Sequence, residues 1–260
     1  MTPADIQETF NRHWKPGWGS VSADEADFIQ SLIVQHRPRS FLEIGMASGL
    51  SGGLIASFME ENGGERFLTI DHDNTFFGDK TKENGFLIGD IYLGSQVSVE
   101  KRPFTTALDL QSLGQAFDMA FIDANHQHPW PIIDTLCLYP SLTGPKIVIH
   151  HDLRLFRKQD LVFGIGPKYL FDQFPDSHKK RSIANDGNIF FIDLSLGKDM
   201  IENIAADAFN LPWSLRTPMQ SKYVDAFRGI LLNYYSSYLS DVFDDCVKKF
   251  NMMDRFRSGL

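Results

Sequence analysis

Short apolar runs alternate with helical patterns over most of this 260-residue chain. Apolar runs predict strands at residues 41–44, 66–70, 97–99, 117–122 and 146–149, with closing strands at 182–184 and 189–192. Apolar positions three or four apart predict helices at residues 22–37, 51–60, 129–140 and 167–174. Strand–helix alternation is typical of right-handed βαβ units. We therefore predict an α/β fold with a doubly wound, mostly parallel, seven-stranded sheet.

The two ends of the chain depart from this alternation. Residues 1–20 contain Trp14, Pro16, Trp18 and two glycines, which predicts an irregular aromatic arm. After residue 196 there is no strand pattern, and apolar positions from Tyr223 to Phe250 keep a helical spacing. We predict an arm (1–20), a sheet domain (21–196) and a helical extension (197–260), in which the pattern from Tyr223 to Phe250 forms one long amphipathic helix or two. The extension could serve as a dimer contact, a lid or a clamp on the sheet.

Composition narrows the classes of function. The 25 Lys and Arg against 33 Asp and Glu give a net charge of −8, so there is no electrostatic footprint for a nucleic-acid backbone. No apolar run approaches the roughly 18 residues that a membrane span needs, and the acidic, polar start differs from a signal peptide. Two cysteines cannot build a disulfide framework. We expect a cytoplasmic protein with neither nucleic-acid nor membrane partners.

The segment at residues 41–60 has the form strand, glycine turn, helix. Gly45 and Gly49 allow a tight turn with close backbone approach, and the following helix offers unpaired N–H groups. Asp71 ends the next strand, where a carboxylate can accept both hydroxyls of a ribose. No Gly-Lys-Ser/Thr follows, and the spacing does not match G-x-G-x-x-G. The alternative is a glycine turn with no ligand.

Four segments together resemble a known family. Residues 41–51 (FLEIGMASGLS) resemble the E-I-G-x-x-x-G-x-S motif of class I S-adenosylmethionine-dependent methyltransferases, closest to the small-molecule O-methyltransferase branch that includes the catechol type. Residues 69–71 (TID), 121–126 (FIDANH) and 144–152 (GPKIVIHHD) are similar to its later motifs, in the right order and spacing. The resemblance covers roughly residues 20–195. It implies a Rossmann-like methyltransferase fold that uses S-adenosylmethionine and releases S-adenosylhomocysteine.

The resemblance also implies which residues hold the cofactor. The ribose hydroxyls would meet Asp71, and the adenine would lie near residues 101–103, although the family's acidic signal is missing there. The full set of implied cofactor contacts is Glu43, Gly45, Ser48, Gly49, Ser51, Asp71 and Asp123.

Histidines and carboxylates cluster at the ends of two strands that should be neighbours. The cluster comprises Asp123, His126, His128, His150, His151 and Asp152. A hydroxyl acceptor needs a general base or a divalent cation that lowers its pKa. In metal-dependent relatives the Asp at strand four and a pair after strand five bind magnesium, and here Asp123 and His151-Asp152 occupy those places. The histidine suits zinc, iron, nickel or manganese better than magnesium.

Three interpretations of this cluster remain open. The first is a metal site formed by Asp123, His151 and Asp152. The second is a metal-free site with His126 or His151 as general base beside Asp123. The third is a set of hydrogen-bonded loop residues without chemistry, which is what we expect of His128.

The function predicted from the sequence is methyl transfer from S-adenosylmethionine to an oxygen of a small-molecule or sugar-like acceptor. Nitrogen is the less favoured acceptor atom. An NAD-dependent oxidoreductase is a weaker alternative, because the glycine spacing does not fit. The other alternative is a non-catalytic protein that binds the cofactor and acts through protein contacts. The C-terminal helices could also form a homodimer.

Overall fold

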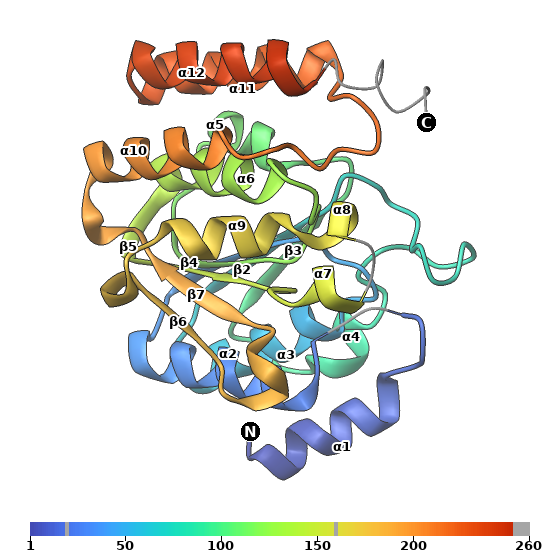
Figure 1. Ribbon diagram of the computed structural model, residues 1–260. Coiled ribbons are helices and arrows are strands. Elements are labelled where there is room, and N and C mark those ends of the chain that lie inside the picture. The colour runs from blue at the N-terminus through green and yellow to red at the C-terminus, as the bar shows by residue number, and fades with distance from the viewer. Residues whose placement is uncertain (19–20, 159–160, 252–260) are drawn as a thin grey trace.

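The computed structural model describes residues 1–18, 21–158 and 161–251, and a central sheet organises them (Figure 1). Its seven strands are β1 (Ser40–Ile44), β2 (Arg66–Ile70), β3 (Ser98–Arg102), β4 (Phe117–Ile122), β5 (Leu142–His150), β6 (Lys179–Arg181) and β7 (Phe190–Asp193). Their order is β3-β2-β1-β4-β5-β7-β6; β1 to β5 pair in parallel, and β7 pairs antiparallel with both β5 and β6. The predicted doubly wound, mostly parallel sheet is confirmed.

Helices cover both faces of the sheet. They are α1 (Pro3–His13), α2 (Ala23–His36), α3 (Leu50–Glu61), α4 (Ile88–Ile91), α5 (Leu110–Leu113), α6 (Trp130–Leu138), α7 (Leu155–Lys158), α8 (Leu161–Gly164), α9 (Gly166–Gln173), α10 (Lys198–Phe209), α11 (Ser221–Tyr234) and α12 (Ser237–Phe250). Side chains alternate across each strand. Phe41 and Phe67 therefore pack with α1, α2 and α3, whereas Leu42 and Leu68 pack with α6, α9 and the C-terminal helices.

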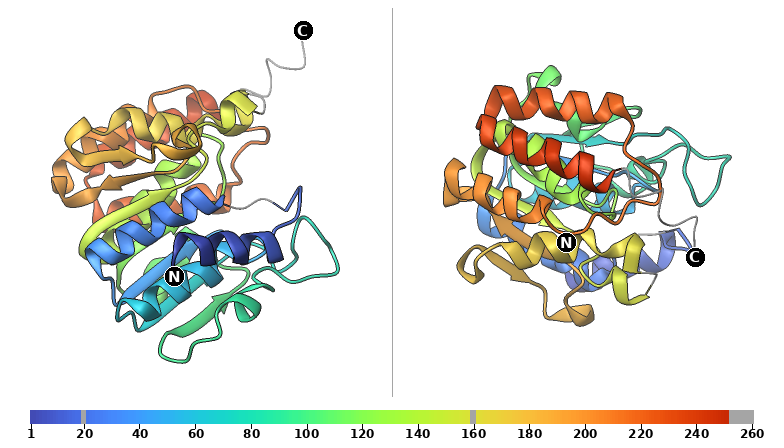
Figure 2. Two further views of the ribbon diagram at one scale, coloured as in Figure 1. Left: turned by 90° about the horizontal axis from the view of Figure 1, so that it is seen from below. Right: turned by 45° about the horizontal axis from the view of Figure 1, so that its top comes forward.

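Over the described residues, the pattern from Tyr223 to Phe250 forms two helices, α11 and α12, one of the two predicted alternatives, and α10 precedes them. In Figure 2, α11 and α12 lie side by side, outside α10. Fully buried aromatic rings join this layer: Phe209 lies 5.4 Å from Phe243, and Phe227 lies 4.8 Å from Phe243, between ring centroids. The same apolar cluster includes Leu42 and Leu68 of the sheet, so the extension shares one core with the sheet domain. The proposed domain boundaries remain predictions, and residues 19–20 and 252–260 lie outside the described residues.

Two local predictions are wrong. Residues 3–13 form α1 instead of an irregular arm, because Thr2 and Asp5 make a capping box at its start. The strand predicted at residues 182–184 lies instead at Lys179–Arg181, which pairs with β7 as the outer strand of the sheet. Charged residues are common on such edges, where they discourage pairing with another chain.

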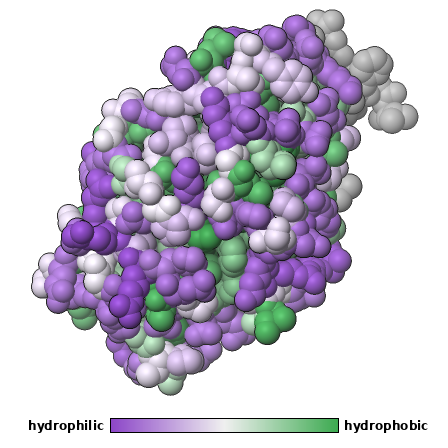
Figure 3. All heavy atoms as spheres, turned by 90° about the vertical axis from the view of Figure 1, so that its left-hand side faces the viewer, coloured by the Kyte–Doolittle hydropathy of each residue, from purple (hydrophilic) through white to green (hydrophobic). Residues whose placement is uncertain are grey.

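Apolar side chains on one flank of the molecule are scattered. Figure 3 shows this face as mainly hydrophilic, with hydrophobic groups in small separate spots. Isolated exposed apolar residues are ordinary on a folded protein. Within the part of the chain that is described, none of the helices combines the length and the apolar character required to span a membrane.

Candidate active site

The carboxyl ends of four neighbouring strands carry the residues that the sequence singled out. Ile44 pairs with Ile70 on one side and with Ile122 on the other, and Ile122 pairs with His150. The next residue of each strand therefore falls in one row: Asp71, Gly45, Asp123 and His151. The row crosses from β1 to β4, where the strand order reverses. Open α/β sheets bind their ligands at this kind of switch point.

The predicted glycine turn joins β1 to α3. Gly45 has a φ of +103°, and a Cβ there would lie 2.1 Å from the carbonyl oxygen of Asp123. Gly49, the N-cap of α3, has a φ of +87°, and its Cβ would lie 2.7 Å from Cα of Gly85. Both positions thus require glycine, because a neighbouring backbone approaches too closely for any side chain.

Asp71 holds the turn from the end of β2. Its Oδ2 accepts a hydrogen bond from the backbone N–H of Met46 at 2.9 Å, and its Oδ1 accepts from the N–H of Asp73 at 3.1 Å. A carboxylate has about four acceptor positions, and Nδ1 of His72 also lies 3.2 Å from Oδ1, so Oδ2 keeps the more open position for a hydroxyl donor. Ser48 is buried in the same turn, and its carbonyl accepts from the N–H of Leu87 at 3.0 Å.

Glu43 lies beneath the turn and is fully buried. The hydroxyls of Ser51 and Thr69 each donate to its carboxylate at 2.6 Å. Burial disfavours the charged form more than these hydrogen bonds favour it, and the pKa of Glu43 is raised to about 8. Glu43 and Ser51, which the resemblance placed on the cofactor, thus bond to each other, with Thr69 as a third member that the motif did not indicate.

The raised pKa of Glu43 predicts a pH-dependent stability. The folded state keeps a proton that the unfolded chain loses above pH 4.5, so the free energy of unfolding falls as pH rises from about 4.5 to about 8. Glu43→Gln has no proton to lose, and its stability relative to the wild type should improve over this range by up to roughly 5 kcal/mol. Urea unfolding at pH 5 and pH 8 measures this difference, with the exposed Glu8→Gln as control; parallel shifts in all three proteins would contradict the prediction.

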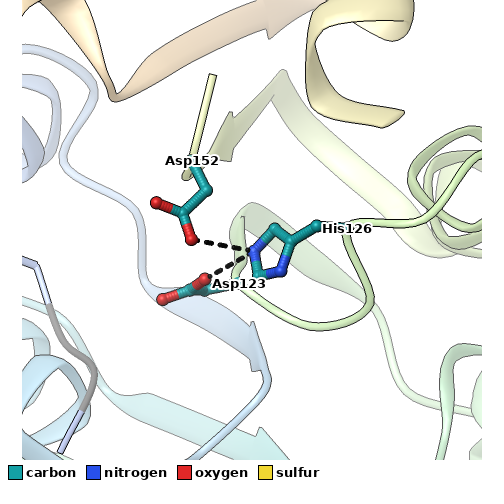
Figure 4. Close-up of side chains that lie close together, drawn as sticks. All are labelled: Asp123, His126 and Asp152. Carbon is teal, nitrogen blue, oxygen red and sulfur yellow. Dashed lines mark hydrogen bonds and ion pairs between the residues drawn. The ribbon is translucent and has the colours of Figure 1, made fainter. Parts of the chain in front are cut away.

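Two aspartates converge on one histidine at the ends of β4 and β5. The Nε2 atom of His126 lies 3.1 Å from Oδ1 of Asp123 and 3.3 Å from Oδ2 of Asp152. Figure 4 shows both carboxylates directed at this nitrogen. Because carboxylate oxygens only accept, Nε2 carries the proton, and Nδ1, which has no hydrogen-bond partner among the described residues, presents the lone pair of the neutral ring. The described residues include one possible metal-binding group, Asp123, His126 and Asp152, whose ligand atoms all lie within 4.8 Å of one another. The predicted metal site had His151 in place of His126.

His151 extends the cluster towards α2. Its Nδ1 lies 3.3 Å from Oδ2 of Asp123 and 3.6 Å from Oδ1 of Asp152, without a hydrogen bond to either. Its Nε2 lies 3.3 Å from Oε2 of Glu25, and Asn188 donates to Asp152 at 3.0 Å and to Glu25 at 3.3 Å. The sequence analysis did not identify either Glu25 or Asn188 as a member of this cluster.

Electrostatics in the cluster favour positive charge. Burial by itself lowers the pKa of both imidazoles, but the carboxylates outweigh it. The pKa of His126 is raised by its hydrogen bond to Asp123 and by the charge of Asp152, and the pKa of His151 is raised well above its usual value by Asp123 and Asp152. Burial by itself raises the pKa of Glu25. Its contacts with His151 and with Ser22 at the start of α2 together outweigh burial, and the pKa is lowered to about 2. The carboxylates of Asp123, Asp152 and Glu25 thus surround the imidazoles of His126 and His151. Their negative charge stabilises protonated imidazole or a bound cation.

The other two histidines of the predicted cluster lie elsewhere. His150 stacks on Phe190 with ring centroids 5.3 Å apart, and its Nε2 lies 3.3 Å from the hydroxyl of Thr135. Burial lowers the pKa of His150 to about 3 and that of His128 to about 4, so both are neutral at physiological pH. His128 packs against Tyr169. Both occupy structural positions, as expected for His128.

The C-terminal extension forms hydrogen bonds to the loop that carries His126. The hydroxyl of Ser214 accepts from the N–H of His128 at 2.8 Å, and the N–H of Ser214 donates to the carbonyl of His128 at 3.0 Å. The N–H of Arg216 donates to Oε1 of Gln127 at 2.9 Å. These contacts join the extension to the loop after β4, and the three roles expected of the extension stay predictions.

Comparison with known proteins identifies the domain. Residues 42–153 match the family model described as a methyltransferase domain. The chain carries a methyltransferase domain. A proposed caffeoyl-CoA O-methyltransferase from Staphylococcus aureus has the same fold, with 18% identity, a TM-score of 0.50 and coverage of 74% of this chain and 92% of that one. The O-methyltransferase TomG from Streptomyces achromogenes, solved with S-adenosylmethionine, has 17% identity and a TM-score of 0.49 over 74% of this chain and 88% of that one.

No curated protein matches the methyltransferase chain significantly. The predictions of a Rossmann-like methyltransferase fold and of a methyltransferase are confirmed. The matched region begins in β1 and ends just after Asp152, so it includes the glycine turn, Asp71 and the cluster around His126.

Proposed function

We propose that the protein transfers a methyl group from S-adenosylmethionine to a hydroxyl oxygen of a small-molecule acceptor, with His126 as general base. The observation that carries the proposal is the position of Nε2 of His126 between Asp123 and Asp152, at 3.1 and 3.3 Å. This arrangement fixes the ring and leaves Nδ1 to accept a proton, as in other acid–histidine pairs.

The residues at the carboxyl edge fit the cofactor. Asp71 at the end of β2 keeps acceptor capacity beyond its two backbone donors and the ring of His72, which suits the hydroxyls of a ribose. The backbone of the turn from Gly45 to Gly49 lies beside it at the start of α3. Bound here, S-adenosylmethionine supplies an electrophilic methyl group on a positively charged sulfur. The carboxylates of the cluster around His126 favour that positive charge nearby.

The protein's own part in the reaction is positioning and proton transfer. Nδ1 of His126 accepts the proton of the acceptor hydroxyl while the oxygen of that hydroxyl forms a bond to the methyl carbon. The bond from that carbon to sulfur breaks, and its electron pair stays on the sulfur of the product, S-adenosylhomocysteine. Asp123 and Asp152 stabilise the imidazolium that forms, because both carboxylates face its Nε2–H. In-line displacement depends chiefly on this alignment.

A divalent cation held by Asp123, His126 and Asp152 is the second candidate, favoured by the closeness of their three ligand atoms. Two carboxylates and an imidazole suit manganese, iron or zinc. Such an ion would lower the pKa of the acceptor hydroxyl in place of a base. It would compete with protons for His126.

Rates measured against pH in chelator-treated protein separate the two candidates. With His126 as base, kcat/KM should survive EDTA and rise with pH through an apparent pKa above 6.5, because only the neutral ring accepts a proton and the pKa of His126 is raised. Asp152→Asn should move this midpoint to lower pH, since Asp152 raises that pKa. Activity that disappears with EDTA and returns with manganese would favour the metal and reject the base.

A further inference from the structure

A cavity beside the catalytic loop is not used by the mechanism above. It has a volume of about 180 Å³ and lies between the loop after β4 and the segment that leads into α11. Asn125 and Gln127, which flank His126 in sequence, line it on one side. Thr217, Gln220 and Tyr223 of the C-terminal extension line it on the other, with Trp130 between. This volume is many times the space that one bound water needs, which suits one small ring.

The cavity walls offer hydrogen-bonding groups that the protein itself leaves unused. Oδ1 of Asn125 accepts from the N–H of Gln127, and Oε1 of Gln127 accepts from the N–H of Arg216. The side-chain nitrogens of both amides make no hydrogen bond to any described residue, and the same holds for the side chains of Thr217 and Gln220. Amides and a hydroxyl supply donors and acceptors together, which is what the hydroxyl groups of a ligand require.

Two aromatic rings and three apolar residues, Leu215, Pro218 and Met219, complete the lining, and none of the described lining residues is charged. Trp130 and Tyr223 stand edge to face, with ring centroids 5.8 Å apart and an angle of 81° between the planes. Aromatic side chains present an apolar face together with a polar handle. No described lining residue carries a charge that would pair with a carboxylate or phosphate, and the nearby ammonium of Lys222 lies over the ring of Tyr223, 4.6 Å from its centroid. The amides and hydroxyl of the lining suit a neutral polar ring.

We propose that this cavity binds a neutral, polyhydroxylated ring of the acceptor, of the pyranose type, and so places one of its hydroxyls near His126. The inference rests on the proposed function, since it names the acceptor class of the same site. A pyranose pairs its hydroxyls with the amides and Thr217, and its C–H face packs on the aromatic rings. A flat apolar phenol would bury those amides unpaired, which is unfavourable.

The test uses simple sugars as probes on the full-length protein. S-adenosylhomocysteine binding is first measured by calorimetry, and saturation-transfer NMR then follows methyl glycosides of glucose, galactose, mannose and rhamnose with the product bound. At least one glycoside should give a signal and accept a labelled methyl group from S-adenosylmethionine. Thr217→Val and Gln220→Ala should each weaken its binding by roughly fivefold to tenfold. Asn233→Ala, which removes an exposed amide elsewhere on α11, should leave it unchanged.

The possible failures are distinguishable. Loss of S-adenosylhomocysteine binding would overturn the proposed function itself. Normal product binding with no glycoside signal, or binding and methylation of catechol instead, would overturn the sugar subsite and leave the proposed function standing. A glycoside that binds equally well to Thr217→Val and Gln220→Ala would show that it sits elsewhere, and would overturn the assignment of the cavity.

Discussion

Replacing His126 with glutamine is expected to lower kcat for methyl transfer by roughly 10²- to 10⁴-fold, the usual contribution of a general base. Glutamine can still donate through its amide to Asp123 and Asp152, which lie 3.1 and 3.3 Å from Nε2 of the histidine. It has no basic nitrogen, so the acceptor hydroxyl keeps its proton. The effect should therefore fall on kcat, with little change in cofactor binding or stability.

Three measurements define the result for His126→Gln: initial rates with labelled S-adenosylmethionine, calorimetry with S-adenosylhomocysteine, and thermal unfolding. His178→Gln is the matched control, because His178 lies in a short turn before β6 and contacts Ser177 rather than the cluster. A variant that folds, binds the product and retains full kcat would exclude His126 as the base.

Gly45→Ala is expected to destabilise the protein by roughly 4 kcal/mol or more, a range reserved for severe steric or burial defects. Its φ is +103°, and a Cβ would lie 2.1 Å from the carbonyl oxygen of Asp123. The neighbouring atom is backbone at the end of β4, so it cannot swing aside as a side chain can. Relief would require β1 and β4 to separate at the active site, and both cofactor binding and activity should be lost.

Gly63→Ala separates the cost of a left-handed backbone conformation from the cost of the steric clash, since both contribute in Gly45→Ala. Gly63 also has a left-handed φ, +81°, but no atom lies within 4 Å of its Cβ position. It should lose only about 1–2 kcal/mol, the intrinsic penalty of that conformation. Urea unfolding of both variants measures the difference. Equal losses would mean that backbone conformation, and not the contact with Asp123, makes glycine necessary at position 45.

The row of residues at the strand ends was predictable because parallel strands bring their carboxyl ends to one edge of a sheet. Asp71 and Asp123 therefore lie near the glycine turn, as their places in the sequence indicated. His150 and His151 were not separable in the same way. Consecutive residues of a strand point to opposite faces, and only the structure shows that His150 packs on Phe190 while His151 enters the cluster.

Glu25 could not have been found from its pattern. Its place three residues after Ser22 is fully explained by a capping box, and the structure contains that box. The same carboxylate also reaches His151, because α2 begins against the end of the sheet. Helix α1 was missed for the opposite reason: Thr2 and Asp5 form a similar box, but the tryptophans and glycines further on suggested an irregular segment.

The paired hydrogen bonds between Ser214 and His128 have a consequence for engineering and for divergence. A chimera that exchanged the helical extension for that of a related enzyme would change one wall of the proposed acceptor cavity and, at the same time, the contacts that hold the loop of His126. Acceptor range and rate would then change together. Substitutions in this extension therefore affect both the cavity lining and the hydrogen bonds to the loop after β4. We expect an exchange of the extension to preserve activity only when the loop after β4 is exchanged as well.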